Sequence, residues 1–161
     1  MAVFKEIYQE YGRPVYHFLL SLSGDSDQAE ELLQETFYQA FLHIDSFEGR
    51  CSVFTWLCQI GKNAWLKECR RKRRFETVEP EWWELEDRRG SPEEQVIKKD
   101  EYRRIRAAVF RLEEPYQDVF IMHVFGGMKL KEIAEMKGKT ESWARVTYYR
   151  AKAMIIKEAE R

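Results

Sequence analysis

The residues of this sequence with the most useful chemistry are cations, amides and aromatics that suit nucleic acid. The segment from Leu130 to Lys152, LKEIAEMKGKTESWARVTYYRAK, has the pattern of a helix-turn-helix with a basic, aromatic second helix. Ile133 and Ala134 would pack the first helix, and Gly138 permits the turn. A plain helical hairpin is the alternative. The side chains placed to enter a major groove, at spacings of three and four, are Ser142, Arg145, Val146, Tyr149 and Arg150.

A second cationic segment closes a predicted helix over residues 54–74. Five successive basic residues, 70–74, cover every face of a helix and therefore suit phosphates, whose counterions they would release. The alternative is an exposed helix end whose cations complement the helix dipole. Asn63, about two turns upstream, could read a base edge. The predicted nucleic-acid contacts here are Asn63, Lys67, Arg70, Arg71 and Arg74.

The loop before that helix, DSFEGRCS, carries an aromatic and a cation around Gly49. On an exposed loop, Phe47 and Arg50 could stack on and hold an unpaired base. The alternative is that Phe47 packs back into the core.

An acidic amphipathic helix precedes the loop. In AEELLQETF and its continuation, the apolar stripe faces the core, so the polar residues between must point outward. An exposed Gln-Glu pair flanked by acids suits a basic helical partner, and the alternative is a merely solvated face. The residues predicted to point outward are Gln28, Glu31, Gln34, Glu35 and Tyr38, of which Glu31, Gln34 and Glu35 are the predicted docking residues.

Catalytic chemistry is absent from the sequence. There is no nucleotide-binding glycine loop, no nucleophile beside a base and no metal cluster, so we expect no enzyme, cofactor, metal or small-molecule substrate. Cys51, Cys58 and Cys69 form no C-x-x-C pair and are expected to be reduced thiols. No apolar run approaches the ~20 residues that span a bilayer, and the N-terminus lacks a signal-peptide core. We therefore expect a cytoplasmic protein without a membrane-inserted segment.

Two small helical domains must position these residues. The chain has 161 residues and a net charge of -1, but its charges lie in alternating acidic and basic blocks. No strand pattern is present, which predicts an all-α fold. The expected helices are 3–22, a helix from Asp25 with Gln28 as a capping partner, 54–74, 92–111, 114–125, 130–136 and 140–158. The expected organisation is an N-terminal three-helix domain (1–74) without a pocket, an acidic linker (75–91) and a four-helix domain (92–161). The first helix of the four-helix domain is expected to begin with a capping box at Ser91.

The order of these parts resembles the extracytoplasmic-function (group IV) bacterial sigma factors of the sigma-70 family. The resemblance rests on six segments in family order. They are A29-E-E-L-L-Q-E-T-F37, F47-E-G-R-C-S-V-F-T-W-L57, I60-G-K-N63, L112-E-E-P-Y116, K131-E-I-A134 and Y149-R-A151. The family pattern is not followed at Trp143, Ala144 and Thr147. These departures affect which -35 DNA sequence would be read, and they do not affect the type of domain.

The resemblance implies an alternative sigma factor that brings core RNA polymerase to promoters. Gln34 and Glu35 would dock on the β′ clamp helices. Phe47, Asn63 and the basic run would melt and read the -10 element. The second domain would read the -35 element. The implied partners are core polymerase through β′ and β, promoter DNA and an anti-sigma factor. It also implies that the acidic linker threads the polymerase channel later used by RNA. Our hypothesis is that Trp82 and Trp83 anchor the linker or an inhibitor, and the alternative is a solvated tether. One rival is a self-sufficient helix-turn-helix regulator, and another is an enzyme of nucleic acid.

Overall fold

The computed structural model describes residues 2–75 and 92–160, and the chain divides into two compact units, Met1–Pro80 and Glu81–Arg161. Within the described ranges every regular element is helical, which confirms the predicted all-α class. Most of the predicted linker, Trp82, Trp83 and the predicted cap at Ser91 lie outside the described residues.

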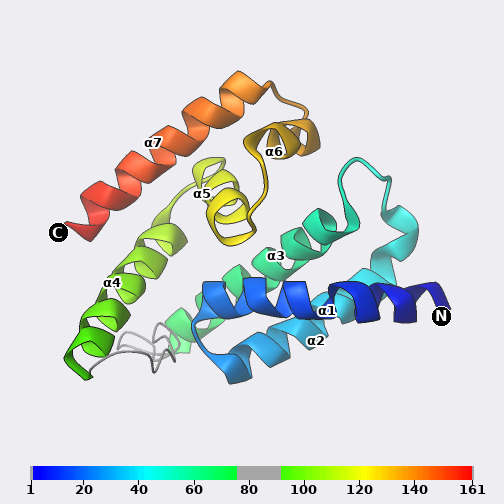
Figure 1. The fold of residues 1–161 in the computed structure, drawn as a ribbon, viewed down its shortest axis with the longest axis horizontal. Coiled ribbons are helices and arrows are strands. Elements are labelled where there is room, and N and C mark those ends of the chain that lie inside the picture. Colours follow the sequence, from blue (N-terminus) through cyan, green and yellow to red (C-terminus); the bar gives the residue numbers. More distant parts are fainter. Residues whose placement is uncertain (1, 76–91, 161) are drawn as a thin grey trace. The chain divides into compact units, whose positions relative to one another are not determined.

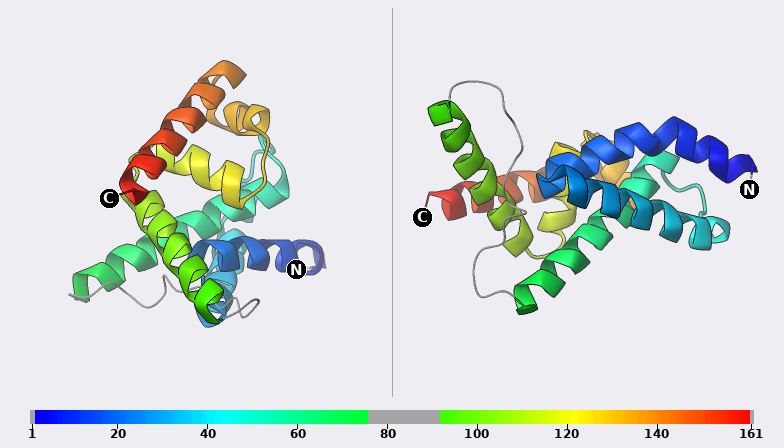
Figure 2. Two further views of the ribbon diagram at one scale, coloured as in Figure 1. Left: turned by 60° about the vertical axis from the view of Figure 1, so that its left-hand side comes forward. Right: turned by 90° about the horizontal axis from the view of Figure 1, so that it is seen from below.

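Three long helices build the first unit (Figure 1). They are α1 (Ala2–Ser23), α2 (Ser26–His43) and α3 (Val53–Phe75), with a short 3-10 turn, η1 (Ile44–Ser46), after α2. Each helix contacts the other two, and the two further views show the same three-helix arrangement (Figure 2). The shared core consists of aliphatic and aromatic side chains, among them Val15, Leu19, Leu22, Leu32, Phe37, Leu57 and Trp65.

Side-chain caps fix where α2 and α3 begin. The Asp25 carboxylate accepts hydrogen bonds from the N–H groups of Asp27 at 2.8 Å and Gln28 at 3.3 Å. The Ser52 hydroxyl accepts the N–H of Thr55 at 3.1 Å. These bonds satisfy N–H groups that a helix leaves without an intrahelical partner. Both helices begin within one residue of the predicted start.

A glycine lets α3 approach α1 and α2 closely. A Cβ atom placed on Gly61 would lie 3.0 Å from Leu19 Cδ2 and 3.2 Å from Thr36 Oγ1. Only hydrogen fits between these side chains without displacement, so Gly61 sets the spacing of the three helices.

The second unit contains α4 (Pro92–Arg111), α5 (Tyr116–Phe120), α6 (Leu130–Lys137) and α7 (Glu141–Ala159). The helix predicted over 114–125 is instead α5 followed by a π-helical turn, η3 (Ile121–Phe125). Helix α7 packs against α4, α5 and α6. Its buried side, together with residues of the other helices, forms a core of Val109, Val119, Ile121, Met122, Ile133, Ala144, Ala151 and Ile155.

Candidate docking and nucleic-acid interfaces

The outward side of α2 carries the predicted docking residues. Glu31, Gln34 and Glu35 are all exposed, because the buried stripe of Leu32 and its neighbours faces the core. Gln39 Nε2 donates a 2.8 Å hydrogen bond to Glu35 Oε1, one turn along the same helix. We call Glu31, Gln34 and Glu35 the docking face. It presents two carboxylates and an amide to a partner.

Gln28 does not join that face, and the prediction that it points outward is wrong. Its side chain is only 6% exposed, and neither amide atom has a hydrogen-bond partner. Gln28 therefore takes part in the cap only through its backbone N–H, which donates to the Asp25 carboxylate, and not through its side chain. Gln28 stands at the edge of the apolar stripe, on the side of α2 that faces α3, where the neighbouring helix covers it.

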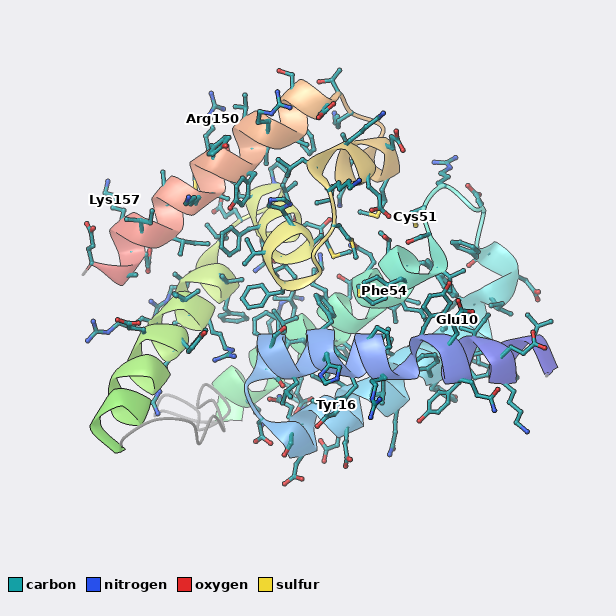
Figure 3. All side chains as sticks on the ribbon, in the orientation of Figure 1. Glu10, Tyr16, Cys51, Phe54, Arg150 and Lys157 are labelled. Carbon is teal, nitrogen blue, oxygen red and sulfur yellow. The ribbon has the colours of Figure 1, made fainter. Side chains whose placement is uncertain are left out.

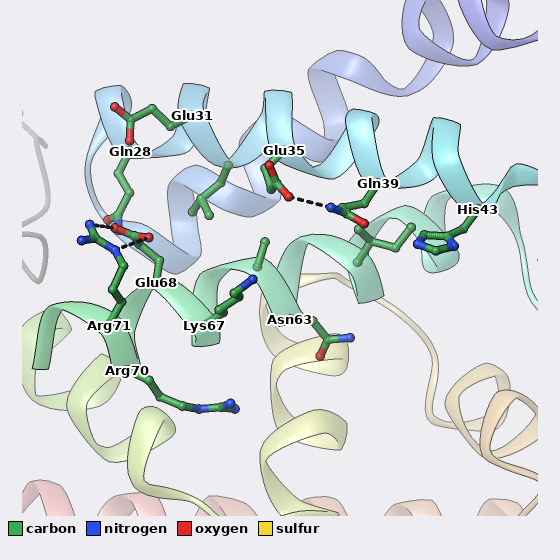
Figure 4. A pocket seen from close by; sticks show the side chains of 13 residues that line it. Gln28, Glu31, Glu35, Gln39, His43, Asn63, Lys67, Glu68, Arg70 and Arg71 are labelled. Atoms are coloured by element: carbon green, nitrogen blue, oxygen red, sulfur yellow. Dashed lines mark hydrogen bonds and ion pairs between the residues drawn. The ribbon is translucent and has the colours of Figure 1, made fainter. Parts of the chain in front are cut away.

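A groove runs along the outer side of the contact between α2 and α3, although the sequence predicted no pocket in this half (Figure 4). Its volume is about 860 Å³. Carboxylates and amides of α2 line one side, and an amide and cations of α3 line the other. The lining residues are Gln28, Glu31, Leu32, Glu35, Gln39, His43, Ile60, Asn63, Ala64, Lys67, Glu68, Arg70 and Arg71. Of the predicted polymerase contacts, Glu31 and Glu35 thus border this groove, and Gln34 does not line it. The predicted nucleic-acid contacts that border it are Asn63, Lys67, Arg70 and Arg71, whereas Phe47 and Arg50 lie in the loop and do not line it.

The cationic end of α3 is only partly available to phosphates. Asn63, Lys67 and Arg70 are exposed. Arg71, however, donates to both oxygens of Glu68 at 2.6 and 3.2 Å, which forms an i,i+3 ion pair. The hydrogen bond from Arg71 lowers the pKa of Glu68 against the opposing effect of its partial burial. The Arg74 side chain lies outside the described part.

The loop between α2 and α3 positions its aromatic against the next helix. Phe47 is half-buried, and its ring lies 5.0 Å from that of Trp56 at an angle of 39°. Arg50 is exposed and forms a 3.0 Å ion pair with Glu48. Phe47 thus packs on Trp56 and stays partly exposed, and its contact with an unpaired base remains a prediction.

Helix α7 presents all five predicted reading residues to solvent. Ser142, Arg145, Val146, Tyr149 and Arg150, here called the readout face, are exposed, and Figure 3 shows Arg150 and Lys157 on the outer side of the helix. Arg145 also pairs with Glu141 at 3.1 Å, one turn earlier. Trp143 is half-buried beneath the Lys139 ammonium, 5.9 Å from the ring centre, in agreement with a packing role.

Two features that sequence reasoning missed position α7. The Thr140 hydroxyl accepts the Trp143 N–H at 3.1 Å and caps the helix. Lys137, at the end of α6, pairs with the buried Asp118 of α5. Thr140 could have been found from its position before the helix, as N-caps favour Thr. The ion pair joins residues far apart in sequence and has no local signal. Gly138, with φ of 67°, makes the turn between α6 and α7, as predicted.

The described residues hold no group of three metal-ligand side chains, and none of their helices is long and apolar enough to cross a membrane. Cys58 and Cys69 are buried and Cys51 is partly exposed, and none of the three forms a disulfide. Burial raises the pKa of the Cys58 thiol strongly, which keeps it protonated and unreactive.

Family comparisons agree with this arrangement. A family model described as Sigma-70 region 2 matches residues 7–75, and one described as Sigma-70, region 4 matches residues 102–155. The SigM ECF sigma factor of Bacillus subtilis (strain 168) is 30% identical over 152 residues, covering 93% of this chain and 91% of SigM. SigX of the same organism is 27% identical, covering 98% of this chain and 84% of SigX.

Solved structures share the fold. A structure of the Bartonella quintana sigma factor RpoE in complex with the anti-sigma factor NepR has a TM-score of 0.59 at 21% identity, covering 99% of this chain and 98% of RpoE. CnrH in complex with the cytosolic domain of CnrY has a TM-score of 0.56 at 18% identity, covering 94% and 84%.

The matched regions, in this order, define a bacterial RNA polymerase sigma factor, a transcription initiation protein and not an enzyme. With its relatives, the chain belongs to the extracytoplasmic-function (ECF) sigma factors. As an alternative sigma factor, it directs RNA polymerase to promoters.

Proposed function

We propose how this sigma factor divides its task between its two units. The predicted domain 1–74, within the first unit, docks on the β′ clamp helices through Glu31, Gln34 and Glu35, and it melts and reads the -10 element. The predicted domain 92–161, within the second unit, reads the -35 element through the readout face. The observation that carries this division is that each unit exposes one such face on a helix whose opposite side is buried.

The -10 contacts are assigned to the exposed residues beside the groove and the loop. Asn63 would read a base edge, Lys67 and Arg70 would hold phosphates, and Phe47 would stack on an unpaired base. Arg50, Arg71 and Arg74 complete the set proposed from the sequence. Arg50 and Arg71 would first have to exchange their contacts with Glu48 and Glu68 for phosphates.

The proposed setting is the cytoplasm, where core polymerase works, with an anti-sigma factor as a further partner. The anti-sigma proposal draws on the solved complex of a similar fold with NepR. Contact with the polymerase β subunit is proposed on family resemblance alone.

The docking assignment is tested by replacing Gln34 and Glu35 together with alanine. Both side chains are exposed, so the free energy of unfolding should change by less than about 0.5 kcal/mol while affinity for core polymerase falls. Binding is measured by fluorescence titration and folding by circular dichroism. Unchanged affinity in a folded variant would remove the docking assignment.

A further inference from the structure

The exposed side of α2 continues past the docking face into an apolar stretch. Tyr38 is 58% exposed and Leu42 is 53% exposed. Glu31, Glu35, Tyr38 and Leu42 are spaced by four, three and four residues, so they follow one line along the helix. This line is acidic in its first half and apolar in its second.

Other aromatics near the end of α2 are already engaged within the unit. The Phe37 ring lies 4.9 Å from that of Tyr8 and 6.1 Å from that of Phe4. The Phe41 ring lies 5.2 Å from Phe4. These contacts place Phe37 and Phe41 toward α1, whereas the helical spacing turns Tyr38 and Leu42 away from it. Two large apolar side chains side by side in water favour a partner that covers them.

We propose that Tyr38 and Leu42 form the apolar half of the surface that binds core RNA polymerase. The occupant is one amphipathic helix of the polymerase, with basic residues against Glu31 and Glu35 and apolar residues against Tyr38 and Leu42. This inference rests on the proposed docking function of the same helix. Its support is the continuity of exposed side chains along one helix face, from the carboxylates of Glu31 and Glu35 to Tyr38 and Leu42. The two carboxylates would be complemented by a basic partner.

The dimensions of the surface fit a helix. Glu31 and Leu42 are separated by 11 residues, or about 16 Å along α2, which is about three turns of a partner helix. A contact of that length can hold both a charged and an apolar patch. A second copy of this chain is a poorer occupant, because its own acidic half would meet Glu31 and Glu35 or cover the apolar half with carboxylates.

The two halves should respond differently to salt. Ions screen the acidic half, so its contribution to affinity falls as salt rises. Burial of Tyr38 and Leu42 does not depend on screening in this way. Replacing the apolar pair should therefore lower affinity without changing the slope of log Kd against log salt, whereas replacing charged Glu35 should reduce that slope.

The test compares three variants of the full chain in binding to purified core polymerase at several salt concentrations. Y38Q/L42Q removes the apolar half but keeps residues that favour helices, Y38F/L42M preserves it, and Q34A/E35A removes part of the acidic half. We expect Y38Q/L42Q to raise Kd about tenfold or more with an unchanged salt slope, as burial of half-exposed side chains implies. Y38F/L42M should bind like the wild type.

The outcomes separate the two proposals. If folded Y38Q/L42Q binds polymerase with wild-type affinity while Q34A/E35A binds more weakly, the proposed role of Tyr38 and Leu42 is overturned. The docking assignment of Gln34 and Glu35 then still stands. Wild-type affinity of both variants would overturn the docking assignment itself. A third outcome is that Y38Q/L42Q binds polymerase as the wild type does, while sedimentation shows a dimer for the wild type and a monomer for the variant. That result would assign Tyr38 and Leu42 to self-association and would overturn the inference.

Discussion

The Lys137 ammonium at the end of α6 forms an ion pair with the carboxylate of Asp118 in α5, a side chain with no solvent exposure. Because Lys137 immediately precedes the Gly138 turn, the pair anchors the helix-turn-helix to the rest of the second unit. A buried carboxylate that loses its cation is costly, which makes this link directly testable.

Lys137→Met should lower the free energy of unfolding by about 2 kcal/mol, less than for a fully buried pair because Lys137 is partly exposed. Urea unfolding followed by circular dichroism measures this. Lys131→Met, on an exposed lysine of the same helix, is the control and should change stability by less than about 0.5 kcal/mol. Equal unfolding midpoints for the two variants would show that the pair adds no stability.

Thr140→Ala should destabilise the start of α7 by about 1 kcal/mol, because the Trp143 N–H loses its acceptor. Since the readout face begins two residues later, affinity for duplex promoter DNA should fall as well. Thr140→Ser keeps the hydroxyl and should retain both properties. Thermal unfolding and a DNA-binding titration measure the two effects, and an alanine variant with wild-type values in both would contradict the role of the cap.

Gly61→Ala should lower the free energy of unfolding by about 1–3 kcal/mol, since its Cβ would press on Leu19 and Thr36. Gly12→Ala is the matched control. A Cβ there meets only the Tyr8 ring at 3.9 Å, so the higher helix propensity of alanine should stabilise the protein by about 0.5–1 kcal/mol. Effects of the same sign in both variants would contradict the close-approach argument.

Phe47→Ala and Asn63→Ala should impair promoter melting more than polymerase binding. Loss of a stacked base contact costs about 1–3 kcal/mol, and loss of a base-edge hydrogen bond weakens recognition of the same strand. Permanganate footprinting of unpaired thymines reports the melted region. Because Phe47 also packs on Trp56, circular dichroism must show a folded protein. Unaltered footprints in both variants would assign melting to other residues.

Helix positions and exposed faces could be predicted from the sequence because both depend on local patterns. The cap at Asp25, the turn at Gly138 and the apolar periodicity place α2 and the helix-turn-helix close to their observed bounds. The inward position of Gln28 could not be predicted, because a residue at the edge of an apolar stripe is buried or exposed according to how its neighbour packs.

Contacts between distant residues were equally hidden. The Asp118–Lys137 pair and the groove between α2 and α3 depend on how helices cross, which periodicity within one helix does not specify. The Glu68–Arg71 pair, in contrast, has i,i+3 spacing and could have been predicted from local rules.

The most direct test of the central claim is run-off transcription by purified core RNA polymerase on a promoter library, with and without this protein. The account predicts discrete start sites that appear only when the protein is present and that weaken in both Q34A/E35A and R145A/R150A. A contradictory result would be no start site beyond those of core polymerase alone, together with a dimer that binds duplex DNA by itself, as expected of a self-sufficient helix-turn-helix regulator.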